Sequence, residues 1–122
     1  MAAVSIAFST PEATGNTCPS QARPIDLVHL ASQTMGDKGL EIEVMDMFSR
    51  QARRALQDMA GAETAKVRAT AHRLKGAAAG IGAFRVSRAA AMVEEDATDP
   101  ARLVALSAAV VEAENFILTL GR

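Results

Sequence analysis

The 122-residue sequence has no tryptophan or tyrosine, only four phenylalanines, and a single cysteine. An internal disulfide needs two cysteines, so Cys18 cannot form one, and a reducing compartment is the simplest expectation. Aromatic residues favour strands, and their 3% share therefore argues against a sheet. The net charge of −1 argues against a domain that binds polyanions as a whole.

Long apolar runs and an early cluster of basic residues are also missing. We see no apolar run approaching the roughly 20 residues that cross a bilayer, and we expect no membrane association. The first 22 residues contain no Lys or Arg, so the apolar patch at 2–8 lacks the basic start of a secretory signal. The expected location is the cytoplasm.

The chain divides into a tail and one helical domain. Residues 1–22 mix Ser, Thr, Pro, Gly and Asn without periodicity and predict a flexible tail, while 23–122 read as a helical bundle. Short links between four long helices predict an all-α fold, an antiparallel up-down four-helix bundle with a short extra N-terminal helix. The expected helices cover 24–35, 38–60, 63–79, 83–96 and the segment from Pro100 onward, with a turn at Gly80–Gly82.

Apolar periodicity indicates which faces point inward. The segment from Pro100 alternates steps of three and four between apolar residues, which predicts a seam for packing against antiparallel neighbours. These residues are Leu103, Leu106, Val110, Ala113, Ile117 and Leu120. In 38–60 the predicted inward face consists of Leu40, Val44, Met47, Phe48, Ala55, Leu56 and Met59.

The most informative segment is Ala-His-Arg-Leu-Lys-Gly at 71–76. Positions three and four apart share a helix face, so Lys75 and Gly76 both border His72. Side chains lean toward the helix N-terminus, and a residue at 76 would normally overhang the imidazole. Glycine removes that overhang at a cost of about 1 kcal/mol in helix propensity. We infer that something large must reach His72.

The surroundings of His72 favour a docking surface. Its helical neighbours Arg68, Ala69 and Ala79 are basic or small, and we expect them to contact a partner, while the opposite face is an apolar stripe. An exposed neutral imidazole is a competent nucleophile toward an activated phosphoryl group. Lys75 can offset phosphoryl charge, and Glu94 in the following antiparallel helix is the candidate acceptor that fixes the imidazole tautomer.

These residues resemble the histidine-containing phosphotransfer (HPt) domains of bacterial phosphorelays. Val93-Glu94 stands where the family shows Leu-Glu, and Val86 stands where Leu is usual. The resemblance spans roughly 24–120 and is sharpest over 71–94. The matching residues are His72, Leu74, Lys75, Gly76, Gly82, Ala83, Val86, Val93 and Glu94.

The resemblance implies that His72 accepts a phosphoryl group from a receiver-domain aspartate and passes it to the aspartate of another receiver. Lys75 would neighbour the phosphate, Gly76 would give access, and Glu94 would hold the imidazole. The partners would be receiver domains of response regulators or hybrid histidine kinases, and Mg²⁺ would reside on the receiver. We expect no cofactor or metal on this chain, which we expect to be a monomer. No Gly-rich nucleotide loop is present, so we expect a phosphocarrier without an ATP site rather than an enzyme.

Three other readings deserve comparison. Residues 74–90 resemble the turn and recognition helix of a helix-turn-helix DNA-binding regulator, and 63–93 hold six basic side chains and one acidic one. Such motifs usually place Ala where Gly76 stands, so we favour phosphotransfer and expect no nucleic acid. A metal-binding bundle lacks a Glu-x-x-His pair. A structural adaptor leaves Gly76 unexplained, and His29, without supporting neighbours, reads as an ordinary structural or surface residue.

Overall fold

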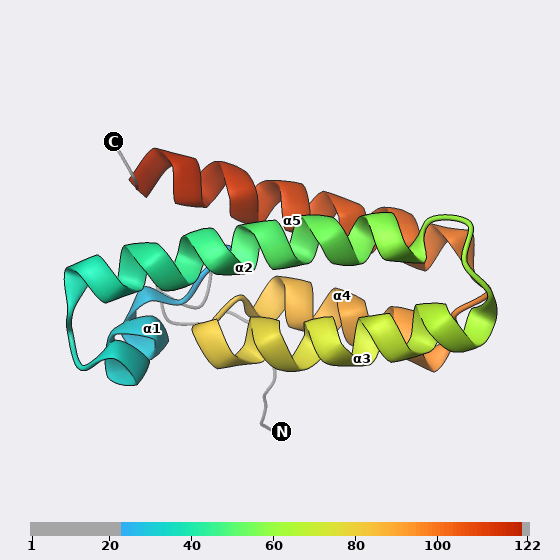
Figure 1. The fold of residues 1–122 in the computed structure, drawn as a ribbon, viewed down its shortest axis with the longest axis horizontal. Helices are drawn as coiled ribbons and strands as arrows, with labels where there is room; N and C mark the ends of the chain where they lie inside the picture. The colour runs from blue at the N-terminus through green and yellow to red at the C-terminus, as the bar shows by residue number, and fades with distance from the viewer. Residues whose placement is uncertain (1–22, 121–122) are drawn as a thin grey trace, which may run out of the picture.

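The computed structural model describes residues 23–120, and the predicted tail at 1–22 lies outside them. This part of the chain folds into five helices with no strand, which confirms the predicted all-α bundle. Four long helices run up and down beside one another, and the short first helix lies across one end (Figure 1). The helices are α1 (Leu27–Thr34), α2 (Lys38–Met59), α3 (Thr64–Ile81), α4 (Phe84–Glu95) and α5 (Pro100–Leu120).

The four long helices form a closed square. Each packs against two neighbours, in the order α2, α3, α4, α5 and back to α2, and the contact between α3 and α4 is the most extensive. Helices α3 and α5 therefore lie on a diagonal and do not touch. Their outer faces point away from each other.

Asp26 begins α1 and attaches it to the bundle. Its carboxylate Oδ1 accepts hydrogen bonds from the backbone N–H groups of Val28 (3.0 Å) and His29 (3.1 Å), as an N-cap does. The prediction of a helix starting at Pro24 is wrong by three residues because this cap sits further along the chain. The Asp26 N–H also donates to the carbonyl of Gly82 (2.8 Å), which joins α1 to the α3–α4 turn.

The α3–α4 turn is tighter than the sequence predicts. Gly80 is still helical, and only Gly82 turns the chain, with a φ of 88°. The N–H of Ala83 bonds to the carbonyl of Ala78 (2.8 Å), the pattern of a Schellman C-cap. The predicted turn over Gly80–Gly82 is thus reduced to one left-handed residue, because this cap lets α3 continue to Ile81.

The inward face of α2 differs from the predicted one. Leu40 is exposed and Met47 is 61% exposed, whereas Met45 is buried in the core. Glu41 is also buried, and its Oε2 accepts a hydrogen bond from the Thr34 hydroxyl (3.3 Å). This polar contact with α1 turns Glu41 inward and leaves Leu40 in solvent. Phe48, Ala55 and Met59 are buried as predicted.

Helix α5 is long and apolar enough to cross a membrane by length and composition, so the expectation that no segment reaches this limit is wrong. That test alone is weak evidence for a membrane span, since core helices of globular proteins also pass it. Here Leu106, Val110 and Ala113 point into the bundle core. Only 17% of the most apolar window is buried, however, so much of this apolar surface faces outward.

Candidate functional site

His72 lies on the outer face of α3, midway along the helix. Its side chain is 65% exposed, while Ala71 and Leu74 on the opposite side are buried in the core. The core side chains therefore fix the rotation of α3 and hold the imidazole toward solvent, as the apolar stripe predicts.

Glu94, near the end of α4, contacts two titratable residues of α3, His72 and Lys75. Its Oε2 lies 2.7 Å from Nδ1 of His72, and its Oε1 lies 2.7 Å from Nζ of Lys75. The hydrogen bond from Lys75, and after it the hydrogen bond from His72, lowers the pKa of the Glu94 carboxyl. An ionised carboxylate only accepts hydrogen bonds, so Nδ1 of His72 carries the proton. The other ring nitrogen, Nε2, has no hydrogen-bond partner within residues 23–120.

Arg68 holds the end of α4 against α3. Its Nε donates to the backbone carbonyl of Glu94 (3.2 Å), in the last turn of α4, where carbonyls lack intrahelical partners. In the sequence Arg68 looks like a surface cation for phosphate or partner. Its bond to Glu94 went unpredicted because it depends on how two helices are rotated about their axes.

A shallow open depression of about 450 Å³ surrounds the imidazole. Ala69 lines it as predicted, whereas Gly76 and Ala79 are not among the lining residues. Gly76 is exposed, and a Cβ built there meets no atom within 4 Å. No contact within the described chain thus requires a glycine at 76. The lining residues are Ala65, Arg68, Ala69, His72, Arg73 and Glu94.

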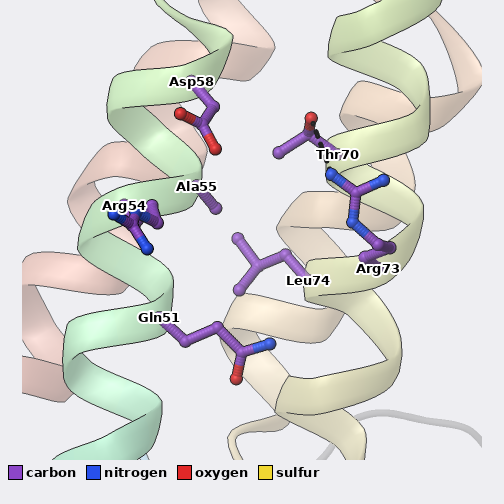
Figure 2. Close-up of a pocket in the computed structure, with 7 residues that line it drawn as sticks. All are labelled: Gln51, Arg54, Ala55, Asp58, Thr70, Arg73 and Leu74. Carbon is purple, nitrogen blue, oxygen red and sulfur yellow. Dashed lines mark hydrogen bonds between the residues drawn. The ribbon is translucent and has the colours of Figure 1, made fainter.

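A second, smaller groove of about 210 Å³ lies between α2 and α3 (Figure 2). Arg54 stands on its α2 side and Arg73 on its α3 side, where Arg73 donates to the hydroxyl of Thr70 (3.4 Å). Arg73 also lines the depression around His72, so the two hollows share a border. Sequence reasoning singled out neither arginine, because Arg54 lies on α2 and Arg73 is not three or four residues from His72. The groove is lined by Gln51, Arg54, Ala55, Asp58, Thr70, Arg73 and Leu74.

The second histidine occupies a different environment. Nε2 of His29 lies 3.2 Å from the carbonyl of Gly80, and its ring meets Phe84 edge to face at 5.2 Å. These contacts confirm that His29 is a structurally satisfied residue at the end of the bundle.

The residues of the site offer few metal ligands. Across residues 23–120, no group of three His, Cys, Asp or Glu side chains gathers in a way that could hold a metal ion. The one carboxylate beside His72 already accepts from the imidazole and from Lys75.

The helix-turn-helix reading finds no support in this geometry. Helices α3 and α4 lie side by side as an antiparallel hairpin (Figure 1). A DNA-binding helix-turn-helix instead sets its two helices at about 90–120°. Residues 74–90 therefore form a bundle hairpin rather than a projecting recognition helix.

Comparison with known proteins agrees with this arrangement. The family model of the Hpt domain matches residues 43–117, which include His72, Lys75, Gly76 and Glu94. No curated protein and no solved structure matches the chain. The family match covers well over half of the sequence, and Hpt domains are phosphocarriers of histidine phosphotransfer in phosphorelays rather than enzymes. The chain belongs to the Hpt domain family.

Proposed function

We propose that this protein takes a phosphoryl group from the aspartate of one receiver domain onto His72 and passes it to the aspartate of another. The observation that carries the proposal is the hydrogen bond of 2.7 Å between Nδ1 of His72 and Glu94, on a side chain that is 65% exposed. In the neutral imidazole this bond places the proton on Nδ1, so Nε2 keeps its lone pair and is open to a partner.

The transfer step balances without an outside reagent. The lone pair of Nε2 attacks the phosphorus of the aspartyl phosphate, the N–P bond forms, and the P–O bond to the aspartate breaks. The aspartate leaves as a carboxylate. The phosphorylated imidazole keeps its Nδ1 proton and gains positive charge, which the Glu94 carboxylate stabilises. Attack by the second receiver's aspartate reverses these steps.

Lys75 and the small residues have supporting roles in this proposal. The ammonium of Lys75, held beside the site by Glu94, offsets charge on the phosphoryl oxygens. Gly76, Ala69 and Ala79 keep the surface low enough for a receiver domain to approach, and Arg68 lies at the edge of that surface. Mg²⁺ would arrive with the receiver, and the chain would work in the cytoplasm.

The test is phosphoryl transfer from a receiver domain carrying labelled phosphate. We expect the wild-type chain to become labelled with an acid-labile phosphohistidine and His72→Gln to stay unlabelled with its helical circular dichroism unchanged. The sequence has only two histidines, so His29→Gln is the matched control and should still accept label. Label that persists in His72→Gln, or disappears in His29→Gln alone, contradicts the assignment.

A further inference from the structure

The outer face of α5 carries an apolar stripe that the bundle does not use. Six exposed residues follow one another at steps of three, four, three, four and three, the spacing of a coiled-coil seam. This stripe lies opposite the buried side of α5 formed by Leu106 and Val110. We call it the outer seam, and it consists of Ala101, Val104, Ala108, Val111, Asn115 and Leu118.

The outer seam carries no charge. Val104 is 69% exposed and Leu118 is 61% exposed, although solvent-facing helix surfaces are ordinarily charged or polar. The charged residues of α5 all lie beside the seam and are already paired within the chain: Arg102 with Glu95, Glu112 with Arg85, and Glu114 with Arg53. An apolar face of this length on a small domain marks an interaction surface.

We propose that the outer seam packs against the same seam of a second copy of this chain, with the two α5 helices antiparallel. The two seams are complementary in the size of their side chains. An antiparallel pairing places Ala101 opposite Leu118, Ala108 opposite Val111, and Val104 opposite the polar Asn115. Leu118 and Val111 then each face an alanine and Val104 faces an asparagine, so no layer pairs two large aliphatic side chains, which keeps the two helices at an even separation along the contact.

A parallel, in-register pairing fits less well. It would place Val104 against Val104 and Ala108 against Ala108, so wide and narrow layers would alternate and voids would form at the alanines. Both arrangements are closed by a two-fold axis, the commonest symmetry of homodimers, so the packing of the side chains is what favours the antiparallel one.

A membrane surface is a poorer match for the same face. Helices that lie in a bilayer interface carry Lys and Arg along their polar face. The one basic residue of α5, Arg102, is paired with Glu95 and lies near the helix start. The opposite side of α5 is committed to the bundle core, so the helix cannot enter lipid without unfolding the domain.

A groove of about 470 Å³ between α2 and α5 adjoins the outer seam and extends the surface available to a partner helix. Val111, Asn115 and Leu118 belong to both the groove and the seam. Because α5 is diagonal to α3, the pairing leaves His72 open in both copies. The proposal therefore does not depend on the role of His72.

Sedimentation equilibrium over a wide concentration range tests the pairing. We expect the 122-residue chain to form dimers, and Val111→Glu to raise the dimer dissociation constant by about 100-fold or more by placing a charge in the seam. Ile42→Glu, at an exposed apolar position on α2 outside the seam, is the matched control and should dimerise like the wild type. A wild-type chain that stays monomeric at all concentrations, or that binds phospholipid vesicles without dimerising, overturns the proposal.

Cross-linking tests the orientation. In a Cys18→Ser background, mixed Ala101→Cys and Leu118→Cys chains should form a disulfide heterodimer on oxidation, because the antiparallel pairing brings these positions together. Leu118→Cys alone should not cross-link, since its two copies would lie at opposite ends of the contact. A Leu118→Cys homodimer that forms more readily than the mixed one overturns the antiparallel arrangement.

Discussion

At the scale of single residues, the site depends on one carboxylate that serves two donors. Glu94 holds the imidazole of His72 through one oxygen and the ammonium of Lys75 through the other. If Nε2 gains a phosphoryl group, Lys75 has a second anion within reach, and its bond to Glu94 competes with that contact. Glu94 would then turn more fully to the imidazole at the moment when the ring becomes positive.

A substitution at Gly76 should affect the stability of α3 and the access of a partner to His72 in opposite directions. Gly76→Leu should stabilise α3 by roughly 0.5–1 kcal/mol, because glycine is a poor helix former and a Cβ at this position meets no atom within 4 Å. The leucine side chain should cover the imidazole and reduce phosphoryl transfer strongly. Urea unfolding and transfer from a phosphorylated receiver measure the two effects.

Gly80→Ala is the control for that experiment. Gly80 is also helical, and a Cβ there also meets nothing within 4 Å, so the substitution should stabilise α3 similarly without slowing transfer. Rapid transfer by Gly76→Leu would refute the access argument.

At the scale of helices and turns, the sequence predicted the all-α bundle and the contact of Glu94 with His72. Helix spacing alone places Lys75 and Gly76 beside His72, and an antiparallel neighbour brings Glu94 to them. The prediction from the sequence was wrong about contacts between helices. Leu40 and Met47 were assigned to the core, and the contact between Arg68 and the Glu94 carbonyl was not predicted. Such contacts depend on helix rotation, which periodicity defines only to within about one residue.

The α3–α4 turn can be tested with a pair of glycines. Both Gly61 and Gly82 have positive φ, at 69° and 88°, but a Cβ at Gly82 would lie 2.8 Å from the backbone oxygen of Asp26 while one at Gly61 meets nothing within 4 Å. Gly61→Ala should cost about 1–2 kcal/mol for the left-handed conformation. Gly82→Ala should cost about 2–5 kcal/mol, because the clash with α1 adds to it.

Chemical denaturation of the two variants gives the difference directly. Equal losses of unfolding free energy would show that α1 moves away at no cost and does not clamp the turn. The expected excess for Gly82→Ala would assign α1 a structural role in the hairpin that carries the site.

At the scale of the whole molecule, carboxylates link stability to pH. The Lys75 and His72 hydrogen bonds lower the pKa of Glu94 below its ordinary value of 4.5, and hydrogen bonds from the hydroxyl and then the backbone N–H of Thr98 lower that of Asp96. A group with a lowered folded pKa contributes stability that is present above its unfolded pKa and is lost as the pH falls through its folded pKa. The free energy of unfolding should therefore decrease as the pH falls below about 4.5.

Glu94→Gln tests the share of this effect that belongs to the site. The variant should lose less unfolding free energy than the wild type between pH 5 and about 2, because the amide does not titrate. Urea unfolding at a series of pH values measures the slopes, and helical circular dichroism at pH 7 checks that the variant is folded. Identical slopes for the two proteins would remove Glu94 from the acid response.

The close packing of α3 against α4 sets the distance between Glu94 on α4 and His72 on α3. Ala71 and Ala78 of α3 and Ala90 of α4 are completely buried, and such small side chains let packed helices approach closely. Enlarging one of them would shift the two backbones apart and stretch the reach from Glu94 to the imidazole. Substitutions at these buried alanines, which no partner would contact, should therefore still change the reactivity of the exposed His72.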